Sequence, residues 1–242
     1  NRTAKAVNRA LETYQFHEAV QLLYHFFWDD FCDWYIELAK DEITSGDRDA
    51  TRRILAVLEQ ALRMLHPFMP YLTEELWQRL PGTSPAMHNG AYAGAEASVM
   101  LAAFPKGDDT SIDESAEAEM SLVIDLIRKV RNIRTEMNIK PSDRVAINVA
   151  ASEEMRDILA ANEAQILKLG RAETLVLGDS LAVPKASARA VLTGGAEIAV
   201  PLEGLIDFEK ERERLRNQIG KLDTELERLN GQLSNKNFVE KA

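Results

Sequence analysis

A run of apolar residues near the carboxyl end places the strongest constraint on the fold. Nine positions are separated alternately by three and four residues, which is the heptad spacing of a coiled coil: Leu205, Phe208, Arg212, Leu215, Ile219, Leu222, Leu226, Leu229 and Leu233. Only Arg212 interrupts the apolar seam. A coiled-coil helix cannot bury such a seam alone, so we expect residues 203–242 to be the first helix of a truncated coiled-coil arm, with a partner helix outside this sequence.

Composition narrows the class of protein. The 242 residues carry a formal net charge of −10 and one cysteine, Cys32. A single cysteine excludes an internal disulfide framework and a cysteine zinc cluster, and it suits a reducing compartment. No apolar run reaches the roughly 18–20 residues of a membrane span, and the first residues show neither a signal-peptide pattern nor a starting Met. We therefore expect a cytoplasmic piece of a longer protein, with no membrane partner.

The first part of the chain has the pattern of a helical bundle. Apolar residues spaced by three and four predict a helix with a wide apolar face over 16–42. Asp47 is a plausible N-cap for a second helix, which should end near His66 because Pro67 disfavours helix in the residue before it. Pro70 can open a third helix.

A loop and a long helix are expected next. The stretch 81–109 is rich in Gly, Ala, Pro and Ser and is predicted to be mostly loop, with a short extended segment over 98–104. Ser111 and Glu114 have the spacing of a capping box. They predict the start of a long connecting helix that ends before Pro141.

The pattern then changes to that of a small α+β module. Residues 144–149 alternate as a half-buried strand does, and Ser152 opens a helical pattern that runs through Leu169. A second short strand is expected over 174–177. Two further strand-like runs flank Gly194-Gly195, as in a hairpin. The predicted fold class is mainly α, with a helical bundle and connecting helix (1–139), an α+β module (140–202) and a coiled-coil helix (203–242).

Residue types that carry chemistry are scattered. The histidines have no metal-binding spacing, and the glycines form no phosphate-binding loop: His17, His25, His66, His88, Gly194 and Gly195. We predict no catalytic, cofactor-binding or metal-binding residues in this chain.

Basic residues offer a different possibility. Arg128, Lys129, Arg131 and Arg134 fall close together on the connecting helix, and such a stripe can hold a phosphate backbone. A solvated helix face with ion pairs to neighbouring acids explains the same residues. Arg212 and Arg216 pose the same question on the seam helix, where interleaved glutamates favour ordinary coiled-coil surface.

Several segments resemble a known family. The twelve residues from His66 to Trp77 resemble the signature of the anticodon-binding bundle in class I aminoacyl-tRNA synthetases, the type shared by the valine, isoleucine, leucine and methionine enzymes. Three segments are similar to valine–tRNA ligases in particular: 31–37, 127–141 and 195–207. Residues 235–239 resemble the point where the first helix of that family's coiled-coil hairpin approaches its turn.

The resemblance implies a tRNA-binding region. The bundle would receive the anticodon stem-loop, and the arm would touch the outer corner of a valine-specific tRNA. We take as candidate tRNA contacts Arg2, Arg9, Arg128, Lys129, Arg131, Arg134, Arg212 and Arg216. The parent enzyme, expected to be a monomer, would attach valine with ATP and edit threonine errors. The ATP-binding signatures and the catalytic and editing domains of the family are absent here, and the first bundle helices look clipped, so we expect no cofactor and no activity in this chain alone.

Two alternatives remain at this point. The chain could be a structural protein that dimerises through the seam from Leu215 to Leu233, and an unpaired seam could in any case drive self-association. It could also be the equivalent region of an isoleucine or leucine enzyme.

Overall fold

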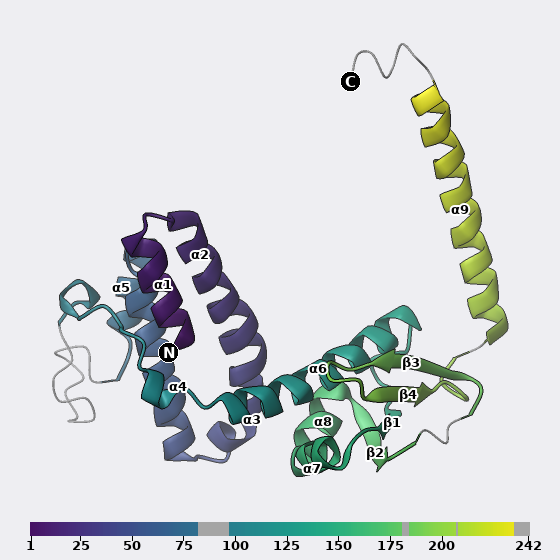
Figure 1. The fold of residues 1–242 in the computed structure, drawn as a ribbon, viewed down its shortest axis with the longest axis horizontal. Helices are drawn as coiled ribbons and strands as arrows, with labels where there is room; N and C mark the ends of the chain where they lie inside the picture. Colours follow the sequence, from purple (N-terminus) through teal and green to yellow (C-terminus); the bar gives the residue numbers. More distant parts are fainter. Residues whose placement is uncertain (82–96, 181–183, 207, 235–242) are drawn as a thin grey trace. The chain divides into compact units, whose positions relative to one another are not determined.

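The computed structural model describes residues 1–81, 97–180, 184–206 and 208–234, except for the side chains of residues 210, 211 and 232–234. It forms two compact units, Asn1–Glu117 and Ala118–Ala242 (Figure 1). The predicted class, mainly α with a small α+β module, is confirmed. Within the described ranges, no helix is long and apolar enough to cross a membrane.

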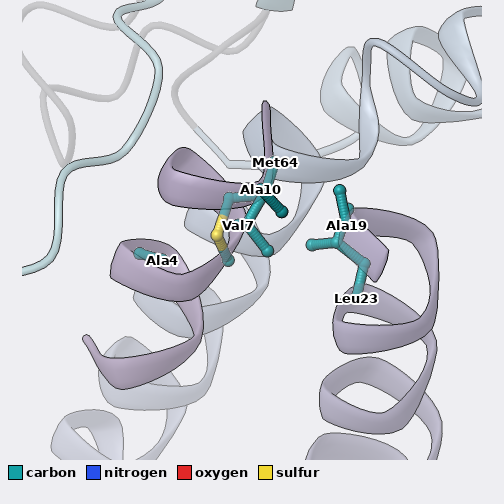
Figure 2. Packing of buried hydrophobic residues seen from close by; sticks show 6 residues of the cluster. All are labelled: Ala4, Val7, Ala10, Ala19, Leu23 and Met64. Atoms are coloured by element: carbon teal, nitrogen blue, oxygen red, sulfur yellow. The ribbon is translucent and has the colours of Figure 1, made fainter. Parts of the chain in front are cut away.

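Small apolar side chains allow the helices of the first unit to approach closely. Figure 2 shows Ala4, Val7 and Ala10 of the first helix facing Ala19 and Leu23 of the second, with Met64 closing the cluster. All six side chains are at most 5% exposed. The first six helices of this unit are α1 (Arg2–Glu12), α2 (Phe16–Tyr24), the π-helix η1 (His25–Tyr35), α3 (Ile36–Thr44), α4 (Arg48–Leu65) and α5 (Pro70–Trp77).

The helix predicted over 16–42 is present, but its middle is not α-helical. The segment α2–η1–α3 is continuous, and the eleven residues of η1 have π geometry, which is rare and usually limited to one turn. The wider turn moves apolar side chains off the single stripe that a period of 3.6 would give. Phe31 and Trp34 are buried, whereas Trp28 is 55% exposed.

Local signals fix the ends of α4 and α5 as predicted. Gly46 has φ +88°, a left-handed conformation that glycine adopts without strain. The Asp47 carboxylate accepts hydrogen bonds from the backbone N–H groups of Asp49 and Ala50, and these bonds lower the Asp47 pKa. The helix α4 stops at Leu65, and Pro70 is the first residue of α5.

The extended segment expected over 98–104 is wrong for residues 99–101, although Ser98 and Ala102 on either side are extended. The structure has a 3₁₀-helix there, η3 (Val99–Leu101), and the Ser98 side chain accepts a hydrogen bond from the Met100 N–H. Val99 packs with Leu62, Trp77 and Leu80 in a second buried cluster. Burial of Val99 between two helices, where no strand lies alongside, explains the tight turn. Residues 82–96 of the predicted loop lie outside the described residues.

The capping box at Ser111 is also wrong. Ser111 belongs to a second 3₁₀-helix, η4 (Asp109–Ser111), and its hydroxyl donates to the Asp108 carboxylate. The connecting helix α6 (Glu114–Glu136) starts later than Ser111 would place it. The carboxylate of Asp113 accepts from the Ala116 N–H at 3.0 Å, so Asp113 performs the capping that the sequence assigned to Ser111.

The α+β module is a four-stranded sheet in the order β2-β1-β4-β3, with two helices in the connection from β1 to β2. The strands β1 and β2 are parallel, and the other pairs are antiparallel. The hairpin with a Gly-Gly turn is confirmed; Gly194 and Gly195 have φ +94° and +90°. The helical pattern predicted from Ser152 to Leu169 divides in two at Asn162. The elements are β1 (Val145–Ala150), α7 (Glu153–Ala161), α8 (Glu163–Gly170), β2 (Ala172–Gly178), β3 (Ser187–Val191) and β4 (Glu197–Pro201).

The core of the module forms where α6, α8 and β1 meet. On β1, buried side chains alternate with half-buried ones, as predicted. A Cβ atom added to Gly170 would lie 3.7 Å from Val130 Cγ1 and 3.8 Å from Ile147 Cδ1. The connecting helix, which we grouped with the bundle, has its buried side chains within the second unit: Leu122, Val123, Leu126, Ile127, Val130, Ile133 and Arg134.

The seam near the carboxyl end lies on one long helix, α9 (Phe208–Ser234). Five of its apolar side chains are 44–61% exposed: Leu215, Ile219, Leu222, Leu226 and Leu229. The expected helix is confirmed. The side chain of Leu233 and the segment 235–239 lie outside the described residues.

Candidate nucleic-acid interface

The eight candidate residues, seven arginines and one lysine, fall on three helices. Arg2 and Arg9 belong to α1, and Arg212 and Arg216 belong to α9. The other four lie on α6. Each of the three helices carries one basic surface.

On α1, one arginine is paired and the other is exposed. Arg2 Nε donates to Glu117 at 2.7 Å and Arg2 Nη2 donates to Glu114 at 3.0 Å, and both bonds raise the Arg2 pKa. A phosphate would have to compete with two carboxylates for this guanidinium. Arg9 lies exposed in the last turn of α1.

On α6, the four basic residues differ in exposure and in what they contact. Arg128 is exposed and Lys129 is half-buried. Arg131 Nε donates to the Leu169 carbonyl at 3.0 Å, at the end of α8. Arg134 is only 7% exposed, and its Nη2 donates to the Lys140 carbonyl at 3.0 Å. Arg131 and Arg134 therefore hold the module together at the carboxyl ends of α6 and α8, a role that the sequence did not indicate.

Arg131 and Arg134 line a common hollow with a third arginine, Arg171. The hollow has a volume of about 490 Å³. Arg171 follows α8 with φ +52°, and its Nη1 donates to the Pro141 carbonyl at 2.6 Å. The remaining lining residues are Thr135, Ile139, Pro141, Leu169 and Gly170. Arg171 was missed by the sequence analysis, since it lies about forty positions from its neighbours and has no basic pattern of its own.

Charge in this hollow is concentrated rather than cancelled. The hydrogen bonds that Arg134 and Arg171 donate go to neutral backbone carbonyls. Burial lowers the pKa of Arg134, and repulsion by Arg171 lowers it further, while Asp143 acts in the opposite direction. A site with this electrostatics favours an anion over a neutral ligand.

The two candidates on α9 lie on an exposed helix. Arg212 Nη1 pairs with Glu209 at 3.1 Å, one turn earlier on the helix. Arg216 lies beside Lys221 in an open hollow of about 560 Å³ that Asn217, Gly220 and Thr224 complete. Arg216 and Lys221 thus form a small basic patch on the arm.

A groove of different character crosses the bundle. It has a volume of about 560 Å³ and is apolar except for Thr73. The rings of Tyr24 and Trp28 stack at its edge, with centroids 6.5 Å apart and planes 8° from parallel. Its other lining residues are Val20, Leu23, Phe27, Leu62, Leu65, Phe68, Met69, Leu72 and Leu76. Because no cation is among the described residues that line this groove, it suits apolar contact rather than a phosphate backbone.

Metal-ligand chemistry gives no further candidate in the described part of the chain, where no three His, Cys, Asp or Glu side chains gather in a way that could hold a metal ion.

Comparison with protein families identifies the helical unit. Residues 1–150 match the family described as the anticodon-binding domain of tRNA ligase. The chain therefore belongs to the tRNA ligases that carry this domain. Residues 207–242 match a second description, the valyl tRNA synthetase tRNA binding arm. The resemblance of His66–Trp77 to the anticodon-binding bundle, and that of the seam to the coiled-coil arm, are confirmed.

The names of individual relatives also specify valine. The whole chain aligns with proteins named valine–tRNA ligase from Geobacter sulfurreducens at 44% identity, from Thermotoga maritima at 41% and from Bacillus subtilis at 41%. It spans 26–27% of the length of these relatives. Neither the structural-dimer reading nor the isoleucine or leucine reading is favoured by these matches.

Proposed function

We propose that this chain is the tRNA-binding, C-terminal part of a valine–tRNA ligase. In this proposal the helical bundle receives the anticodon stem-loop, and the arm that begins with α9 contacts the outer corner of a valine-specific tRNA. One observation carries the proposal: an anticodon-binding domain and a valyl-type tRNA-binding arm match successive parts of the same chain.

The chemistry of the parent enzyme follows from its class. The parent, acting as a monomer in the cytoplasm, attaches valine to tRNA with ATP and removes threonine errors at a second site. This chain contributes affinity and tRNA identity, holds no cofactor of its own and is inactive without the rest of the enzyme. The exposed α9 seam also offers a surface through which isolated copies of this chain can associate, because about half of each of the five apolar side chains from Leu215 to Leu229 remains in water.

The proposed contacts are those on the three basic surfaces. Phosphate contacts by arginine and lysine fix the position of a protein on RNA, and splayed loop bases are read by stacking and by hydrogen bonds to their edges. Arg9 and Arg128 are exposed on their helices, where a phosphate can approach them. Arg2 and Arg212 must exchange carboxylate partners first. Lys129, Arg131, Arg134 and Arg216 complete the set.

Binding of the 242-residue chain to valine tRNA, measured across a salt series, tests the proposal. Each phosphate contact should contribute about 0.7–0.9 to the slope of log affinity against log salt. We expect tighter binding to valine tRNA than to the same tRNA with an altered anticodon. Arg128→Ala combined with Arg131→Ala should flatten the slope by roughly 1.4–1.8, the share of two contacts.

The matched control removes the same charge elsewhere. Arg52→Ala combined with Arg53→Ala deletes two exposed arginines of α4, each paired with a carboxylate, and should leave the slope unchanged. Equal affinity for both tRNAs would reject anticodon recognition by this chain. An unchanged slope in the α6 double variant would reject the α6 contacts.

A further inference from the structure

The hollow at the carboxyl ends of α6 and α8 is built from parts that lie far apart in the sequence. Arg131 and Arg134 come from α6, and Arg171 comes from the turn between α8 and β2. Each guanidinium donates to a backbone carbonyl at 2.6–3.0 Å: Leu169 for Arg131, Lys140 for Arg134 and Pro141 for Arg171. These bonds hold the three groups in place before any ligand arrives.

From this arrangement we infer that the hollow is a preformed site for one phosphodiester group of RNA, with Arg171 at its solvent-facing side. The inference rests on the proposed tRNA-binding function and adds a specific subsite to it. Arg134, which is buried, provides the wall of the site, and Arg131 and Arg171, which are exposed, line its opening.

Geometry favours a tetrahedral oxyanion as the occupant. A guanidinium has five N–H donors in a planar fork, so a single bond to a carbonyl leaves donors able to engage a phosphate in the bidentate manner that arginine prefers. Arg171 makes one such bond, to Pro141, and Arg134 makes two, to Lys140 at 3.0 Å and to the Arg171 carbonyl at 3.4 Å, so both keep further donors. Tethered side chains lose little further conformational freedom on binding, which lowers the entropic cost of ligation.

Charge arithmetic separates a ligand site from a purely structural one. If the arginines served only to cap helix ends, the negative ends of the helix dipoles would balance their positive charge. Each helix C-terminus carries about half of a negative elementary charge, and two such ends meet here. Asp143, which acts on Arg134, adds one full negative charge, and Lys140 adds a positive one at the same turn. Arg134, Arg171 and Lys140 together carry three positive charges against about two negative ones, so a net positive charge remains for an anion.

The first experiment measures whether the hollow binds phosphate. The melting temperature of the 242-residue chain is compared in chloride and in inorganic phosphate at equal ionic strength. Selective binding to the folded state should raise it by about 2–4 °C. Arg171→Gln keeps a hydrogen-bond donor for the Pro141 carbonyl. In chloride it should melt at the same temperature as the unmutated 242-residue chain, but it should lose the rise in melting temperature that phosphate causes. Arg171→Lys should keep part of it.

A matched control accounts for general effects of phosphate and of charge. Arg189 is exposed on β3, at the opposite edge of the sheet from β2. Arg189→Gln removes one charge from the same unit and should keep the full phosphate shift. A full shift in Arg171→Gln would overturn the inference, because the stabilisation would then come from elsewhere.

The second experiment tests whether the hollow binds a phosphate group of RNA. In the salt series with valine tRNA, Arg171→Gln should weaken binding about tenfold at low salt and reduce the slope by about 0.7–0.9. Arg189→Gln should change neither. The inference stands if Arg171→Gln loses both the phosphate shift and this share of the tRNA slope.

The remaining outcomes distinguish the two proposals. If the unmutated chain binds valine tRNA and Arg171→Gln leaves the affinity and the salt slope unchanged, the RNA subsite is overturned while the tRNA-binding function stands. If the unmutated chain fails to bind tRNA, the tRNA-binding function fails. If its rise in melting temperature in phosphate still depends on Arg171, the hollow is a site for free phosphate instead of RNA.

Discussion

Arginine side chains of this chain meet three different environments, although the sequence presents them alike. Arg2 forms ion pairs with two glutamates, Arg134 is buried against a backbone carbonyl, and Arg128 is exposed. Exposed ion pairs contribute little to stability, whereas a buried guanidinium needs its hydrogen bonds. The same residue type can therefore serve the surface, the fold or a ligand, depending on its position.

Two tryptophans in the helical bundle allow a test at this scale. Trp77 is 1% exposed and packs with Leu62 and Val99, whereas Trp28 is 55% exposed at the rim of the apolar groove. Trp77→Ala should lower the free energy of unfolding by about 3–5 kcal/mol, because it leaves a cavity in the core. Trp28→Ala should lower it by less than about 1 kcal/mol. Urea denaturation measures both, and equal losses would contradict the assigned burial.

At the scale of elements, short-range signals set most helix ends. The aspartate before α4 and the proline that opens α5 were recognisable in the sequence because each acts on neighbouring backbone groups. The same logic was misapplied before α6. Ser111 has the correct spacing, but its hydroxyl is already donated to Asp108, and Asp113 takes the capping role. The π geometry of η1 has no such local signal.

Two glycines separate the effect of backbone conformation from that of space. A Cβ would meet nothing within 4 Å at either Gly220 in α9 or Gly46 before α4, but only Gly46 has a positive φ, +88°. Gly220→Ala should stabilise α9 by roughly 0.5–1 kcal/mol, since alanine loses less backbone freedom in a helix. Gly46→Ala should destabilise the bundle, because its conformation is strained for any side chain.

Amide hydrogen exchange resolves these two effects by segment. Protection in α9 should rise with Gly220→Ala, and protection at the start of α4 should fall with Gly46→Ala. If both substitutions changed protection in the same direction, backbone conformation would not be the deciding factor.

At the scale of the whole molecule, the chain consists of two compact units rather than one. The second unit holds its own core, in which β1 and α6 both bury side chains. Gly170 allows α8 to lie against Val130 and Ile147. A unit with its own buried core can in principle fold independently.

Independent folding of the second unit can be measured directly. A chain covering 118–206 keeps the buried face of α6 and all four strands, and it should melt in one cooperative transition by circular dichroism. The control, 118–170, lacks β2, β3 and β4 and should show no such transition. A non-cooperative melt of 118–206 would mean that its core depends on residues outside it.

The sequence by itself determined what depends on neighbours and on periodicity. Helix limits around Asp47 and Pro70, the alternation of β1, the Gly-Gly hairpin and the α9 seam all follow from interactions within a few residues. The motif from His66 to Trp77 was enough to indicate the family. Only the tertiary structure decided which arginines are buried and that Arg171 joins Arg131 and Arg134 around one hollow. These residues are about forty positions apart, and packing of α8 against α6, which no local pattern encodes, brings them together.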